Sequence, residues 1–235
     1  MSSRFRRPAL RRLLPALPLA FAATPARAQQ EDGQLWFQVN TNVPLAEHVR
    51  ITLEQIARVS DRQDGLYQTE YGALLGLRVA PGIELGFGYR HVGAHNGNTG
   101  ADEDRTRQQV VGTFGRFVTR FRVDERFNPR GDEIGVRIRP LLRYNLPLRT
   151  KGVALFVSHE SFYLPNSTSW GQRRGYERMR NIVGASLPIG RAAIVDLGYL
   201  NQYRPGHGAR AQMDHALTMQ LTINLRDALS SPVHD

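Results

Sequence analysis

The chain has 235 residues, a formal net charge of +10 and no cysteine. The lack of cysteine excludes a disulfide framework and a lipid-modified amino-terminal cysteine. Six arginines lie within the first 28 residues, and without that segment the formal charge falls to +4. The high charge is therefore mostly a property of the amino-terminal segment, which argues against a nucleic-acid partner.

Residues 1–28 have the features of a secretory signal peptide. Arginines precede an apolar segment at 13–23, and Ala26-Arg27-Ala28 forms a small-x-small cleavage site before Gln29. The apolar segment is too short, and too interrupted by proline, to span a bilayer. We therefore expect an exported protein whose mature chain begins at residue 29.

Beyond this leader no segment contains about 18 consecutive apolar residues, so the sequence predicts no transmembrane helix. Instead, apolar and polar residues alternate with a period of two, which is typical of β-strands with two different faces. At 67–79, for example, Tyr71, Ala73 and Leu75 share one face, and Glu70 and Gly72 lie on the other. The predicted strands are 34–42, 49–59, 67–79, 83–89, 105–114, 118–127, 134–144, 153–162, 178–187, 193–203 and 215–225.

The connections between these segments alternate in length. Residues 80–82, 115–116 and 188–190 predict tight turns, whereas 93–104, 164–175 and 204–214 predict long polar loops. Short turns at one rim and long loops at the other are typical of outer-membrane barrels, which in bacteria have an even number of strands. Since eleven segments alternate, we predict that one is misread, with 34–42 the first suspect. The expected fold is an all-β, antiparallel transmembrane β-barrel of ten or twelve strands in meander order, covering 29–225 and followed by a tail at 226–235.

The residues on the polar face of the strands favour a membrane barrel over a soluble one. It carries charges of both signs, which can pair across strands inside a wet lumen. Glycines on the same face leave room for arginine side chains, and tyrosines near strand ends on the apolar face would form an aromatic girdle. We therefore expect the apolar face to meet lipid. The alternative is a soluble, lipocalin-like barrel with its apolar face inward.

Several motifs between Arg105 and Asn224 resemble DUF2490, an outer-membrane family of unknown function. They are Arg120-Phe-Arg122-Val-Asp124-Glu-Arg126, Arg137-Ile-Arg139, Glu160-Ser-Phe162, Arg178 with Arg180, Leu197-Gly198-Tyr199-Leu200-Asn201-Gln202, and His215. Weaker similarity reaches back to Trp36. The chain departs from the family pattern at Asp124, where Glu is expected, and at Leu225, which ends the last strand in place of an aromatic residue. The resemblance implies an outer-membrane barrel and no known activity.

The arginines of the polar face have two interpretations. They could form a net positive lumen and a small anion-favouring channel, since rings of arginine select anions in pores. They could equally form a salt-bridge lattice that fills a narrow barrel and leaves a closed structural or surface protein. The candidate lumen-lining residues are Arg120, Arg122, Asp124, Arg126, Arg137, Arg139, Arg143, Glu160, Arg178, Arg180 and Asp196.

His159 and Ser161 support a further alternative, although we expect no enzyme. Both fall on the apolar face of 153–162, where a histidine base and a serine nucleophile could act on a lipid ester. His159-Glu-Ser161, followed by Pro165-Asn166, is similar to a motif of lipid A deacylases, but Phe162 stands where that motif requires Asn. The other interpretation is a pair of polar residues at the membrane interface.

No metal or cofactor is expected. The loop at 93–104 carries His95, Asn96, Asn98, Asp102, Glu103 and Asp104, but it lacks the ligand spacing of a calcium loop and predicts a solvated surface. No phosphate-binding loop, zinc motif or nucleotide fingerprint occurs. The expected location is the outer membrane of a Gram-negative bacterium. The expected partners are outer-membrane lipid, lipopolysaccharide and the barrel-assembly machinery.

Overall fold

The computed structural model describes residues 30–97, 100–150, 152–206 and 210–225. The expected signal peptide at 1–28 and the tail at 226–235 lie outside the described residues. Within these residues no helix is long and apolar enough to cross a membrane. The chain forms β1 (Gln30–Ala46), β2 (Val49–Ser60), β3 (Gly65–Ala80), β4 (Ile83–Ala94), β5 (Glu103–Phe114), β6 (Phe117–Phe127), β7 (Gly135–Pro147), β8 (Ala154–Leu164), β9 (Gly175–Ile189), β10 (Ala193–Arg204) and β11 (Gln212–Asn224).

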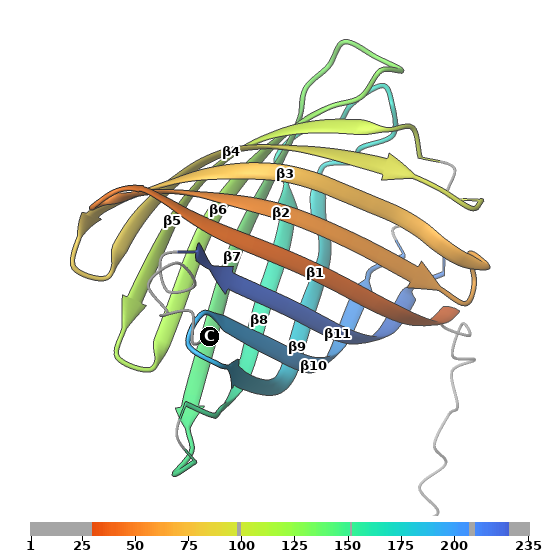
Figure 1. Ribbon diagram of the computed structural model, residues 1–235. Helices are drawn as coiled ribbons and strands as arrows, with labels where there is room; N and C mark the ends of the chain where they lie inside the picture. Colours follow the sequence, from red (N-terminus) through yellow and green to blue (C-terminus); the bar gives the residue numbers. More distant parts are fainter. Residues whose placement is uncertain (1–29, 98–99, 151, 207–209, 226–235) are drawn as a thin grey trace, which may run out of the picture.

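These strands form one closed barrel in which consecutive strands pair antiparallel around the wall (Figure 1). The seam is different, because β1 and β11 pair in parallel, from Gln30 beside Gln212 to Asn42 beside Asn224. In a meander each strand reverses the direction of the one before it. The first and last strands of an odd set therefore run the same way, and such a barrel can close only through a parallel pair.

The prediction of ten or twelve strands is wrong, because the described residues contain eleven. The segment suspected of being misread, 34–42, lies in the middle of β1, a strand of 17 residues. An even number of strands is a regularity of known bacterial barrels, not a physical requirement, and odd-stranded membrane barrels exist in mitochondria. What closure requires is that every wall strand has two neighbours, and the parallel seam provides them.

The two rims of the barrel differ in the length of their connections. The β3–β4, β5–β6 and β9–β10 turns contain Gly82, Gly115 and Gly190, whose φ angles are 74°, 58° and 62°. Glycine adopts this left-handed conformation without steric strain. The long connections β4–β5, β8–β9 and β10–β11 lie at the other rim, as the sequence predicts. We call the two rims the short-turn rim and the long-loop rim.

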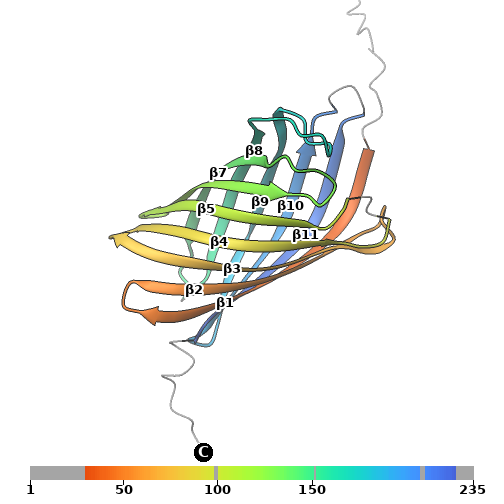
Figure 2. The ribbon, with the colours of Figure 1, turned by 90° about the horizontal axis from the view of Figure 1, so that it is seen from above.

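The described chain begins at one rim and ends at the other (Figure 2). The Gln30 N–H donates a hydrogen bond of 3.0 Å to the carbonyl of Ala211 at the long-loop rim. The Asn224 N–H donates one of 2.7 Å to the carbonyl of Ala192 at the short-turn rim. Opposite ends are the direct consequence of an odd number of strands.

The wall has an apolar outer face and a polar inner face. Phe121, Val157 and Leu217 on the outside are each more than half exposed, whereas Arg107 and Asp124 on the inside are at most 1% exposed. This arrangement is the reverse of a soluble barrel, which fills its interior with the apolar face. The inward polar face that the alternation predicts is therefore present in the structure.

Candidate functional site

The lumen contains a group of ion pairs around Glu160 on β8. Its carboxylate lies 2.5 Å from Nη2 of Arg120, 2.9 Å from Nη2 of Arg139 and 3.9 Å from Nη1 of Arg180. Arg139 also contacts the buried carboxylate of Asp124 at 3.1 Å. The arginines come from β6, β7 and β9, so one carboxylate links four consecutive strands. We call Glu160 and its three arginines the Glu160 cluster.

A second group of ion pairs lies on β2 to β5. Arg90 contacts two carboxylates, Glu54 at 2.8 Å and Glu70 at 2.5 Å. Arg107 also pairs with Glu54, and Arg58 lies 2.8 Å from Glu70. Arg90 and Arg107 are not among the lumen-lining residues predicted from the sequence. Alternation puts both on the polar face, but which polar residues meet one another depends on the register between strands.

Aromatic rings occupy the space between the charges. The guanidinium carbons of Arg58 and Arg180 lie 4.2 Å and 4.7 Å from the centre of the Trp36 ring. Arg139 and Arg180 lie 4.7 Å and 4.6 Å from the centre of the Phe162 ring. These distances are within the range of cation–π attraction. Arg180 extends from β9 past β10 and β11 to reach Trp36 on β1, so the contact bridges part of the lumen.

Two cavities of about 190 Å³ each lie toward the two ends of the lumen. Arg126, Arg178 and Arg180 line the cavity toward the long-loop rim. Arg50 and Glu84, which are 2.7 Å apart, line the cavity toward the short-turn rim. At the level between them the lumen side chains are buried. The described residues thus form one hollow toward each end of the lumen, with the buried side chains of Arg107, Arg122 and Asp124 elsewhere on the inner wall.

The sequence-derived lumen residues all lie on the inner wall. Arg122, Asp124, Arg137, Arg139 and Glu160 are buried, and Arg120, Arg126, Arg143, Arg178, Arg180 and Asp196 are partly buried. Arg143 and Asp196 form an ion pair of 2.6 Å between β7 and β10. Arg122 donates two hydrogen bonds, of 2.9 Å and 2.6 Å, to the side-chain oxygen of Gln109. Each arginine of the predicted set thus has a side-chain partner on the inner wall.

A polar cluster interrupts the apolar outer wall on the long-loop half of β8 and β9. His159 and Ser161 are two residues apart on β8, so both face outward, and His159 Nε2 lies 2.9 Å from Ser161 Oγ. Asn181 stands opposite His159 in the β8–β9 pair, with its Oδ1 2.8 Å from His159 Nδ1. An amide oxygen can only accept a hydrogen bond, so a bond from His159 to Asn181 Oδ1 requires the tautomer with the proton on Nδ1, in which Nε2 can accept the serine proton.

A shift in strand register brings a tyrosine to the same cluster. The pairing of β8 with β9 shifts after Phe162, because β9 contains an extra residue, Glu177. A bulge of this kind changes the direction of the following side chains. Here it turns Tyr176 outward, where its hydroxyl lies 3.2 Å from Ser161 Oγ.

Only half of this cluster can be predicted from the sequence. Alternation alone places His159 and Ser161 on one face. It does not indicate Asn181 and Tyr176, because their contact with the pair depends on the β8–β9 register and on the bulge. The one available signal was an asparagine on the apolar face of the predicted strand 178–187.

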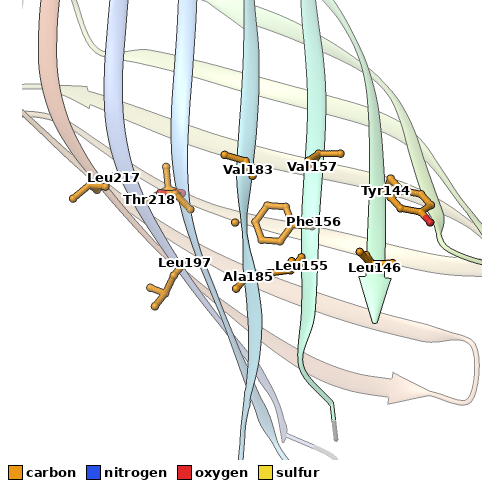
Figure 3. A pocket seen from close by; sticks show the side chains of 12 residues that line it. Tyr144, Leu146, Leu155, Phe156, Val157, Val183, Ala185, Leu197, Leu217 and Thr218 are labelled. Atoms are coloured by element: carbon orange, nitrogen blue, oxygen red, sulfur yellow. The ribbon is translucent and has the colours of Figure 1, made fainter. Parts of the chain in front are cut away.

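Two apolar hollows lie on the outer wall beside this cluster. The first, of about 410 Å³, contains His159 and Asn181 together with apolar side chains such as Leu142 and Val183. The second, of about 830 Å³, extends toward the short-turn rim over β7 to β11 (Figure 3). Tyr144, Val157 and Val183 line both hollows. The two form one continuous apolar surface that ends at the polar cluster.

At the end of the loop that the sequence analysis considered for a cation, Asp104 contacts side chains of β4. His91 Nδ1 lies 2.8 Å from Asp104 Oδ1, and Tyr89 donates to the same oxygen at 2.6 Å. Among the described residues no group of three or more His, Cys, Asp or Glu side chains could hold a metal ion.

Comparison with known proteins identifies relatives but no activity. The family model described as protein of unknown function (DUF2490) matches residues 33–213. An uncharacterized protein of Methylorubrum extorquens is 32% identical over 216 residues, which cover 87% of this chain and 94% of that protein. The siderophore receptor PirA from Pseudomonas aeruginosa matches with 18% identity and a TM-score of 0.27, over 68% of this chain and 33% of the receptor. The chain thus spans about a third of the length of that receptor.

Proposed function

The chain belongs to the DUF2490 family of proteins of unknown function, and we propose that it is an outer-membrane β-barrel whose lumen is closed by its own side chains. The long loops face the cell exterior, and the short turns face the periplasm. The barrel acts as a rigid membrane-embedded support for its outer wall and loops, not as a diffusion channel.

The outer wall supports the membrane placement. Exposed large apolar side chains occur on every strand from β1 to β11, and an apolar surface of this extent needs a partner other than water. The strands have 11 to 17 residues, enough for a tilted crossing of the hydrocarbon layer at about 3.3 Å per residue. Closure leaves no strand edge unpaired, which the bilayer requires.

The Glu160 cluster is the observation that carries the closed lumen. An ion entering the lumen would have to displace arginines that are already paired with carboxylates in a largely buried setting. Leaving one partner of a buried ion pair uncompensated costs about 3–5 kcal/mol. The contact of Arg180 with Trp36 adds a steric obstacle at the same level.

An anion-favouring channel is the second candidate, and one observation favours it. Arg126, Arg178 and Arg180 line the cavity at the long-loop rim, where they could attract anions from that side. In such a channel, movement of the Glu160 cluster would have to connect the two cavities.

Two measurements test the proposal. Washing of isolated outer membranes with alkaline carbonate should leave the protein in the membrane, whereas release by the wash would contradict its integration. Vesicles that contain the refolded protein should swell in small sugars no faster than empty vesicles. Rapid swelling would contradict the closed lumen and favour the channel.

A further inference from the structure

We propose that His159, Ser161 and Asn181 form a serine-hydrolase site on the outer wall, which cleaves acyl esters of membrane lipid. The hydrolytic chemistry goes beyond the proposed function. The choice of membrane lipid as the substrate rests on the proposed membrane placement.

The geometry of the three side chains is that of a nucleophile, a base and a group that orients the base. Their hydrogen bonds of 2.9 Å and 2.8 Å lie within the normal range for such bonds. The order of contacts, from serine to Nε2 and from Nδ1 to an oxygen acceptor, is the arrangement that activates serine in hydrolases on unrelated folds. Asn181 is a positioning residue, because it fixes the tautomer and direction of the imidazole without touching the ester.

The reaction follows from these roles. His159 Nε2 takes the proton of Ser161 Oγ as the oxygen attacks the ester carbonyl carbon. The bond from that carbon to the alcohol oxygen breaks, the alcohol leaves with the proton from Nε2, and an acyl-Ser161 ester remains. Water then attacks this ester, giving its proton to Nε2. Collapse releases the fatty acid, and the proton returns to Ser161 Oγ.

Tyr176 supplies a donor for the charge that develops on the carbonyl oxygen. Its hydroxyl lies 3.2 Å from Ser161 Oγ, close to where that oxygen would sit after attack. Hydrogen-bond donors at this position lower the barrier of acyl transfer. The bulge at Glu177, which turns Tyr176 outward, thereby gains a role at the site.

The surface beside the site determines the substrate class. The hollow that contains His159 and Asn181 continues into the larger hollow over β7 to β11, and both are lined mainly by apolar side chains. An acyl chain held in these hollows would run along the wall, parallel to the lipids around it, with its ester carbonyl beside Ser161. Phospholipids and the lipid A part of lipopolysaccharide share this acyl-ester chemistry.

The test measures release of fatty acid by the purified, detergent-folded protein. One arm supplies phosphatidylcholine in mixed micelles and the other lipopolysaccharide, and mass spectrometry identifies the acid released. We expect hydrolysis in at least one arm, and the arm in which it occurs identifies the lipid substrate. Ser161→Ala and His159→Ala should each lower the rate by about 1,000-fold or more.

His215→Ala is the matched control. His215 is also an outward-facing histidine, 2.5 Å from the hydroxyl of Tyr199, and its loss should leave the rate unchanged. Asn181→Ala should lower kcat with little change in KM, and Asn181→Asp should restore kcat, because a carboxylate can orient the same imidazole. A purely structural role for Asn181 would not produce this split.

A fluorophosphonate probe provides an independent readout at Ser161. The peptide that contains Ser161 should carry the probe in the parent protein and in His215→Ala, but not in Ser161→Ala. No fatty acid in either arm from protein whose gel migration shows it to be folded would overturn the proposal. Equal hydrolysis by Ser161→Ala would also overturn it. Ion conduction by the same preparation would contradict the closed lumen without affecting this result.

Discussion

The guanidinium carbon of Arg180 on β9 lies 4.7 Å from the centre of the Trp36 ring on β1. Two strands, β10 and β11, separate these residues along the wall, so the contact joins parts of the barrel that share no backbone hydrogen bond. Trp36 lies on the strand that closes the barrel through the parallel seam. The filling of the lumen and the closure of the wall therefore depend on one another.

Trp36→Ala should destabilise the barrel and open space in the lumen. The ring is 9% exposed, and truncation of a buried tryptophan to alanine costs about 3–5 kcal/mol. Urea unfolding in lipid vesicles, followed by far-ultraviolet circular dichroism, measures the free energy of unfolding. Phe37→Ala, which changes the outward-facing neighbour, is the control and should cost clearly less. An equal loss in both variants would contradict the inward packing of Trp36.

Glu160→Gln should destabilise the barrel, because it removes the negative charge that pairs with three lumen arginines. Arg120, Arg139 and Arg180 would lose a shared carboxylate, and an uncompensated buried charge costs about 3–5 kcal/mol. The same unfolding measurement applies, and raising the salt concentration should recover little of the loss because buried pairs are weakly screened. Glu47→Gln, at an exposed position in the β1–β2 turn, should change stability by less than about 0.5 kcal/mol. A neutral Glu160→Gln would show that the cluster does not hold the wall.

The position of the long loops can be measured by labelling, since the chain has no cysteine of its own. Single-cysteine variants Ser167→Cys and Gln30→Cys lie at the long-loop rim, and Arg116→Cys lies at the short-turn rim. A membrane-impermeant maleimide added to intact cells should label the first two and not the third. Labelling of Arg116→Cys alone would reverse the orientation. Labelling of Ser167→Cys without Gln30→Cys would contradict the odd strand number.

The parallel seam makes a cross-linking prediction. Asn42 and Asn224 are register partners whose side chains are 2.8 Å apart, so Asn42→Cys with Asn224→Cys should form a disulfide on oxidation. Asn40→Cys with Asn224→Cys is the control. These two positions are offset by two residues along the strands, and a disulfide cannot join Cα atoms that are more than about 7 Å apart. Equal cross-linking of both pairs would contradict this register. A ten-stranded barrel closed by β2 and β11 would cross-link neither.

Much of the wall could be predicted from alternation, and the reason is physical. A strand with lipid on one side and a polar lumen on the other must alternate with a period of two, so residues 49–59 and 67–79 indicate both their conformation and their faces. The same property made β1 difficult. Its alternation is weaker than that of the other strands, and the even strand number of known bacterial barrels argues against an eleventh strand.

Contacts between strands could not be predicted in this way. Alternation puts Glu54 and Arg107 on the same face as many other charges, but their pairing depends on the register of four strands. Asn181 meets His159 for the same reason, and Tyr176 faces outward only because of the bulge at Glu177. Residues that one strand brings together, such as His159 and Ser161, can be predicted from the sequence. Residues that only the closed barrel brings together cannot be predicted in this way.

Closure of the lumen is tested most directly by the ionic current through the refolded protein in a planar lipid bilayer. The parent protein should carry no current above that of the bare bilayer. Labelling of Ser167→Cys from one side confirms that the parent protein is inserted in the same preparation. Discrete steps from the parent protein would contradict a lumen closed by its own side chains.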